Sequence, residues 1–136
     1  MSMASIVNRV NRRIDTQIRK STIELFGSVI KMTPVDTGRA KGNWQCTVGT
    51  AATSEIDRED GSKRDSLSSS KAYEEVVRTV PRAGNVVWLA NNVPYIRNLE
   101  YGSSKQQAPS GMVRVSLERF GSIFADNASK SLSQIK

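Results

Sequence analysis

The longest regular pattern of the chain lies at its start, where apolar residues recur every three or four positions from about Ala4 to Met32. This spacing places them on one face of an α-helix. The residues of this apolar stripe are Val7, Val10, Ile14, Ile18, Leu25, Val29 and Met32. Four basic residues fall almost opposite the stripe: Arg9, Arg13, Lys20 and Lys31. We predict one long amphipathic helix with an apolar side and a basic side.

A second apolar stripe is present only in the C-terminal half of this helix and consists of Ile23, Phe26 and Ile30. A helix that is apolar on two sides must be covered twice. The cover is provided either by two layers of the same fold or by one layer and a neighbouring subunit. The sequence leaves both alternatives open, and these three residues are therefore candidates for a subunit interface.

Two short segments have the patterns of β-strands. From Trp44 to Thr50 polar and apolar residues alternate, with Trp44, Cys46 and Val48 on one side, which is typical of a half-buried strand. The run from Val86 to Ala90 is continuously apolar and predicts a central strand that is buried on both faces. Together they predict a small sheet.

Residues 51–70 are mostly polar and charged, with Ile56 and Leu67 as their only large apolar residues. Such a segment buries too little apolar surface to order itself, which predicts a mobile loop or a protruding arm. A weakly formed hairpin around Asp60 and Gly61 is the alternative. We expect a chain without residues 53–68 to keep its fold.

Three further helices are predicted after this loop. Ser70 can cap a short helix from Lys71 to about Thr79, with Tyr73, Val76 and Val77 facing inward. A second short helix runs from Pro94 to Glu100, with proline at its first position. The final helix runs from Met112 to about Ser129. Its predicted apolar face consists of Val113, Leu117, Phe120 and Phe124.

These elements predict one α+β domain over residues 1–136. A long N-terminal helix and a C-terminal helix pack on a small β-sheet, and a mobile charged loop occupies residues 51–70. The chain contains no apolar run of transmembrane length and no secretory signal at its N-terminus, so we expect no membrane association.

The net charge of +7 favours an anionic partner, either nucleic acid or an acidic protein, with a solvated basic face as the alternative. Arg9, Arg13, Lys20 and Lys31 are the candidate residues for a DNA channel or a partner surface. The sequence has no pattern typical of a DNA-recognition helix pair, an RNA-binding aromatic motif or a zinc knuckle. Any DNA contact is therefore expected to be non-specific.

The sequence offers little for catalysis. It has no histidine and one cysteine, so neither a zinc site nor a cofactor is expected. Cys46 is interpreted as a small buried residue. The tripeptide Asp36-Thr37-Gly38 matches that of aspartic proteases, but it follows a helix and Pro34 rather than an apolar strand. We interpret it as a turn with side-chain-to-backbone hydrogen bonds, and we expect the protein not to be an enzyme.

Two motifs stand at fixed places in this order of elements. The first is Thr33-Pro-Val-Asp-Thr-Gly-Arg-Ala-Lys-Gly-Asn-Trp44, where proline ends the long helix and a glycine can take positive φ. The second is Asn92-Val-Pro-Tyr-Ile-Arg-Asn-Leu-Glu-Tyr-Gly102, which includes the short helix that starts at Pro94. A loop with Gln107-Ala-Pro109 and the segment Gly111-Met-Val-Arg114 then lead into the last helix.

In this order, the motifs resemble the phage minor tail protein Z group, the tail completion or neck proteins of long-tailed bacteriophages. The resemblance covers nearly the whole chain, and residues 51–70 are its least characteristic part. The first motif contributes Pro34, Val35, Asp36, Thr37, Gly38, Arg39, Asn43 and Trp44. The second contributes Asn92, Pro94, Tyr95, Leu99, Glu100, Tyr101 and Gly102.

The resemblance implies a structural virion protein at the head–tail junction, present in the host cytoplasm during assembly. It implies a homo-oligomeric ring, a hexamer or alternatively a dodecamer, that joins the tail tube to the head connector. Its partners would be connector or stopper proteins and tail terminator or tube proteins. The group has no catalytic residues, so the motif residues are expected to determine the fold. A tail terminator ring or a non-specific basic DNA-binding module are the alternatives.

Overall fold

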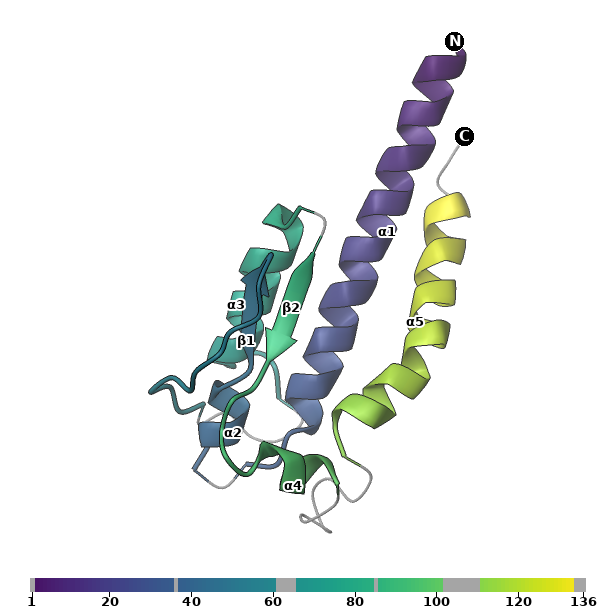
Figure 1. The fold of residues 1–136 in the computed structure, drawn as a ribbon. Helices are drawn as coiled ribbons and strands as arrows, with labels where there is room; N and C mark the ends of the chain where they lie inside the picture. The colour runs from purple at the N-terminus through teal and green to yellow at the C-terminus, as the bar shows by residue number, and fades with distance from the viewer. Residues whose placement is uncertain (1, 36, 61–65, 85, 102–110, 134–136) are drawn as a thin grey trace.

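The computed structural model describes residues 2–35, 37–60, 66–84, 86–101 and 111–133 (Figure 1). The elements in order are α1 (Met3–Met32), α2 (Arg39–Gly42), β1 (Gln45–Val48), α3 (Lys71–Thr79), the 3-10 turn η1 (Val80–Arg82), β2 (Val87–Ala90), α4 (Ile96–Glu100) and α5 (Val113–Ser133). The predicted α+β class is confirmed, with a long N-terminal helix, a C-terminal helix and one small antiparallel sheet.

Helix α1 lies at the centre of this arrangement (Figure 1). Helix α5 runs antiparallel along one side of it, while α3 and the sheet lie on another side of its C-terminal half. The 30 residues of α1 span about 45 Å, and the 21 residues of α5 span about 32 Å at ~1.5 Å per residue. The N-terminal end of α1 therefore projects beyond α3 and the sheet.

The second apolar stripe of α1 lies inside the subunit. Ile30 is 0% exposed, and Ile23 and Phe26 are partly buried against the same core cluster. The layers that cover α1 on both sides belong to this chain, so the alternative of an internal position is correct for Ile30. Its assignment to a subunit interface is wrong, because no surface of Ile30 is left for a neighbour to contact.

The two strands pair antiparallel, with Cys46 opposite Leu89 and Thr47 opposite Trp88. Trp44 and Cys46 are buried in the core, as the alternating pattern predicted, but Val48, predicted on the same side, is 51% exposed. In the other strand Trp88 is 43% exposed. The prediction of a central strand is therefore wrong. Among the described residues the sheet has two strands, so β2 is an edge strand and no layer covers its outer face.

The described residues of the 51–70 segment are irregular but packed on the fold. The Arg58 guanidinium donates to the carbonyls of Gly42 (2.6 Å) and Trp44 (2.9 Å) and forms an ion pair with Glu75 (3.0 Å). Asp60 is buried and accepts a hydrogen bond from Ser70. The prediction of an arm that leaves the fold is thus corrected for residues 51–60, because hydrogen bonds and an ion pair attach this loop where apolar contacts are few.

Helix α3 begins as predicted, since Ser70 Oγ accepts from the backbone N–H of Tyr73 at 3.2 Å. Val76 is fully buried and Tyr73 is partly buried in the core. Val77, which was predicted to face inward, is exposed. Helix α3 packs on α1 and β1. Val76 lies on the side that makes this contact, whereas the next residue, Val77, points into solvent.

The contact between α1 and α5 includes buried polar side chains, which the apolar pattern of α5 did not predict. Ser116 and Asn127 are buried, whereas the predicted core residues Leu117 and Phe124 are exposed. Ser116 Oγ and Ser28 Oγ are 2.8 Å apart, and the Asn127 amide donates to Glu24 at 3.2 Å. Gln17 Nε2 donates to the carbonyl of Phe124 at 3.1 Å. These hydrogen bonds orient α5 so that part of its apolar face points away from α1.

Candidate assembly surface

The side chains of the first motif form hydrogen bonds that connect the end of α1, the turn and the start of β1. Thr33 Oγ1 donates to the carbonyl of Val29 and accepts from Trp44 Nε1, both at 2.8 Å. Buried Asn43 donates to the carbonyl of Arg39 at 2.9 Å and accepts from the N–H of Ile56 at 2.8 Å. These side chains join the end of α1 to the start of β1 and to the loop.

The remaining residues of the first motif shape the turn itself. Pro34 and Val35 are half-buried, and Thr37 Oγ1 accepts from the N–H of Arg39 at 3.3 Å. Gly38 has φ of 85°, which a side chain would disfavour. Arg39 forms an ion pair with Glu55 of the loop. Asp36 lies outside the described residues.

The second motif caps the last helix. The carboxylate of Glu100 accepts from the backbone N–H groups of Met112 (2.9 Å), Val113 (3.2 Å) and Arg114 (2.9 Å). The Arg114 guanidinium donates to the carbonyl of Glu100 and lies 4.8 Å from the centre of the Tyr101 ring. Glu100 thus supplies from α4 the acceptor that an N-terminal capping residue supplies in other helices.

Other residues of this motif are divided between the core and the surface. Leu99 packs against the core cluster, and the Asn92 amide donates to the carbonyl of Ala52 at 3.0 Å. Pro94 and Tyr95 are exposed. Helix α4 starts at Ile96 rather than at Pro94. Gly102 lies outside the described residues.

Replacing Glu100 with alanine should lower the free energy of unfolding by about 2 kcal/mol, because three N–H groups at the start of α5 lose a charged acceptor. Urea unfolding followed by circular dichroism measures this change. Glu118→Ala is the matched control, since Glu118 is an exposed glutamate within α5, the helix that Glu100 caps. Equal stability of the two variants would show that the cap contributes nothing.

Sequence reasoning missed the residues that attach the loop to the sheet. The Glu75 carboxylate pairs with Arg58 of the loop and accepts from the N–H of Cys46 in β1 at 2.7 Å. The Asn91 amide donates to the carbonyl of Ala40 at 2.7 Å. The sequence contains no local signal for these contacts, because each joins segments that are far apart in the chain.

Cys46 is buried, and its pKa is raised from 9.0 to about 11 by burial and, in addition, by the Glu75 carboxylate. Since the thiolate is the reactive species, the folded protein should react with a thiol reagent at pH 8 far more slowly than the chain unfolded in urea. Absorbance after addition of a chromogenic disulfide measures both rates. Equal rates would contradict the buried position of the thiol.

The four basic residues of α1 differ in exposure. Lys20 and Lys31 are exposed, whereas Arg9 and Arg13 are half-buried. Lys31 also lines an open hollow with Arg119 between α1 and α5. These side chains are spread along a helix rather than gathered at one point, which suits an extended anionic surface better than a small anion.

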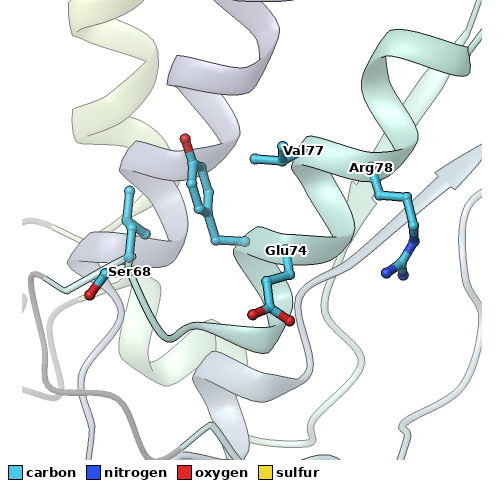
Figure 2. A pocket seen from close by; sticks show the side chains of 6 residues that line it. Ser68, Glu74, Val77 and Arg78 are labelled. Atoms are coloured by element: carbon cyan, nitrogen blue, oxygen red, sulfur yellow. The ribbon is translucent and has the colours of Figure 1, made fainter.

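The hollows that the described residues form contain no recognisable catalytic or metal-binding arrangement. One of about 550 Å³ is lined by Leu67, Ser68, Tyr73, Glu74, Val77 and Arg78. Figure 2 shows that Glu74 and Arg78 project from a different side of α3 than Val77 does. Among the residues that the structure describes, no three metal-binding side chains lie together. We find no arrangement of a nucleophile, a base and an oxyanion site in these hollows.

One surface of the molecule is apolar without being a pocket. Val7, Ile14 and Ile18 of α1 and Leu117 and Phe124 of α5 are exposed by 48%, 51%, 49%, 54% and 38%. We call this set the α1–α5 apolar face. Three of its members belong to the stripe that the sequence predicted to be buried. Towards the C-terminal end of that stripe, Val29 is buried in the core and Met32 packs against it.

Helix geometry places these five residues on one side of the helix pair. The hollow that contains Glu24, Lys31 and Arg119 lies on the other side of the α1–α5 contact. At about 100° per residue, Ile14 and Ile18 lie about 80–140° around α1 from Glu24 and Lys31. Leu117 and Phe124 are displaced by about 140–160° around α5 from Arg119. Because α1 and α5 are antiparallel, the rotation around α1 and the rotation around α5 both lead from the hollow to the opposite side of the helix pair. The five apolar residues therefore share that side.

None of the helices in the described part of the chain has both the length and the apolar composition needed to cross a lipid bilayer. No family model, curated protein or solved structure matches the chain. Two features of the chain itself bear on its function: the two motifs whose side chains form hydrogen bonds inside the subunit, and the exposed α1–α5 apolar face.

Proposed function

We propose that this protein is a structural component of a tailed-phage virion, a neck or tail completion protein that forms a ring at the head–tail junction. The ring joins the tail tube to the head connector. The proposal is supported by the ordered motifs of the sequence, which resemble those of the tail completion group over nearly the whole chain.

The observation that carries the proposal is the exposed α1–α5 apolar face, which is formed by the two longest helices of the described chain. Monomeric proteins rarely leave several large apolar side chains together in water. The residues of the motifs, such as Trp44 and Glu100, form hydrogen bonds inside the subunit. The motif residues thus form their contacts within the subunit, while the apolar face leaves large side chains exposed. Such an exposed face is typical of a subunit that binds another protein in an assembly.

The proposed ring is a hexamer, with a dodecamer as the alternative. Head connector or stopper proteins and tail terminator or tube proteins are its partners, and the virion neck is its location. A ring closes through repeated contacts between adjacent copies. The net charge of +7 suits a channel that holds DNA or a docking surface on an acidic partner ring.

Light scattering gives the test, because it measures the molar mass of the protein alone and in the presence of purified tails. We expect either a discrete ring or a monomer that assembles as a ring on tail ends. A compact monomer or dimer that does not bind tails would contradict the proposal. Tails of an unrelated phage serve as the control for adhesion through the apolar face.

A non-specific DNA-binding module is the second candidate, and the basic composition favours it. In that case the purified protein binds duplex DNA without sequence preference, and the logarithm of the affinity falls linearly with the logarithm of the salt concentration. Fluorescence anisotropy over a range of salt concentrations measures this slope. Such binding by a protein that forms no ring and does not bind tails would favour this candidate.

A further inference from the structure

An open hollow of about 730 Å³ lies between α1, α5 and the start of α3. It adjoins the hollow of Figure 2, because Leu67 and Tyr73 line both. Its apolar lining consists of five partly buried side chains: Ile23, Met32, Leu67, Tyr73 and Ile123. The volume lies in the range of ~300–1,000 Å³ that ligand sites occupy, and this lining can cover apolar groups of a ligand.

Two cations from different helices line the same hollow. Lys31 lies one turn after Gly27 on α1, Arg119 lies one turn before Ile123 on α5, and all four residues line the hollow. Residues four apart share a side of a helix, so the two cations project toward the same space from both helices. Lys31 and Arg119 are exposed, and neither has an ion pair or a hydrogen bond among the described residues.

The hollow also has one carboxylate among the described residues that line it, and this group is already hydrogen-bonded. Glu24 accepts from the Asn127 amide at 3.2 Å, and it forms no ion pair with Lys31 or Arg119. Two cations against one carboxylate give the lining a net positive charge. We call this site the cationic hollow; it offers two cations to an anionic group beside an apolar surface.

We propose that the cationic hollow binds an acidic amphipathic helix of a partner protein. Carboxylates of that helix pair with Lys31 and Arg119, while its apolar side chains cover Ile23, Leu67 and Ile123. Charge complementarity favours an anionic occupant, and the apolar lining favours one with apolar side chains beside its carboxylates. An amphipathic helix presents both kinds of group on one side, and such helices are common ligands of apolar grooves.

Two other anionic occupants match the cationic hollow less well. A nucleic acid presents phosphates on its outside, so it would leave Ile23 and Ile123 without apolar contacts and would bring phosphates toward Glu24. A fatty acid would pair with one cation, but the open hollow would leave part of its chain in water, which is unfavourable. Duplex DNA and oleate therefore serve as competitors in the test.

Fluorescence anisotropy with three labelled peptides tests the inference. The first is an acidic peptide of leucine, alanine and glutamate, with about 18 residues so that it can form a helix and with leucine and glutamate on one side. Glutamine replaces each glutamate in the second peptide, and serine replaces each leucine in the third. We expect the wild type to bind the acidic peptide about 10-fold more tightly than either of the others.

A double variant of the protein assigns this binding to the cationic hollow. Lys31→Glu with Arg119→Glu should lose the acidic peptide and should instead bind a peptide in which lysine replaces glutamate. Lys20→Glu with Arg82→Glu is the matched control, because it makes the same change of charge at exposed positions that do not line the hollow. Circular dichroism checks that both variants are folded, and the control should bind the acidic peptide as the wild type does.

Several results would overturn the inference: no binding of the acidic peptide, equal affinity for the glutamate and glutamine peptides, or an equal loss of binding in both double variants. Displacement of the acidic peptide by duplex DNA or by oleate at physiological salt would assign the hollow to that occupant instead.

The inference goes beyond the proposed function and can fail separately from it. Binding of the acidic peptide through both cations, by a protein that neither forms a ring nor binds tails, would support the inference and contradict the neck function. A ring that forms on tail ends, together with equal affinity for the glutamate and glutamine peptides, would support the neck function and contradict the inference.

Discussion

Deleting residues 53–68 is expected to leave the chain unfolded, which reverses the expectation that the sequence pattern supports. The deletion removes Arg58, whose guanidinium contacts two backbone carbonyls and Glu75. It also removes Asp60, which accepts from Ser70 at the start of α3. Completely buried Lys41 loses the carbonyl of Ser66, to which it donates at 2.8 Å.

The size of this effect follows from the polar groups that lose their partners. Hydrogen bonds to charged groups contribute about 1.5–3 kcal/mol each when the partner stays buried. A small domain has a total stability of about 5–15 kcal/mol. Loss of the contacts of Arg58, Asp60 and Lys41 together therefore consumes most of the stability of the fold.

Circular dichroism during thermal unfolding shows whether the deletion variant is folded. Single substitutions then test how much one residue of the loop contributes to the stability. Arg58→Met should lower the free energy of unfolding by about 3 kcal/mol. Arg82→Met, a change of the same kind at an exposed arginine, should have little effect. A deletion variant that unfolds cooperatively at the temperature of the wild type would show that the segment is a dispensable arm after all.

Gly42→Ala is expected to lower the free energy of unfolding by about 3 kcal/mol, because the loop leaves no room for a methyl group. A Cβ at this position would lie 2.1 Å from the carbonyl oxygen of Arg58. The obstacle is backbone rather than a flexible side chain, so the loop as a whole must move. That movement also draws the Arg58 guanidinium from the carbonyl of Gly42.

Gly121→Ala is the control for this substitution. A Cβ at Gly121 meets no atom within 4 Å, and the residue lies inside helix α5. Alanine has the higher helix propensity, so this variant should be more stable than the wild type by up to about 1 kcal/mol. Urea unfolding of both variants gives the comparison, and a Gly42→Ala protein as stable as the wild type would mean that the loop is not packed on α2.

Elements with strong local signals could be predicted from the sequence. The spacing of apolar residues located α1, and Pro34 located its end within a residue. Ser70 was correctly identified as the cap of α3. These features depend on backbone geometry and on neighbours within a few residues, which the sequence lists directly.

The candidate surface could be predicted only in part. The first stripe of α1 was found, but its N-terminal residues were expected to be buried. The candidates Ile23, Phe26 and Ile30 were found as a second stripe, and Ile30 proved to be internal. Periodicity shows which residues share a side of a helix, but it does not show which of two apolar sides the rest of the chain will cover.

The sequence by itself determined the α+β class, the long first helix, the turn that follows it and the polar composition that offers little for catalysis. Only the tertiary structure decided that Arg58 attaches the loop to the turn and that Glu100 caps α5 from a different helix. It alone also decided that Ile14, Ile18 and Phe124 remain exposed. The physical reason is that these outcomes depend on which distant groups meet, whereas helices, caps and turns are determined by residues close together in the chain.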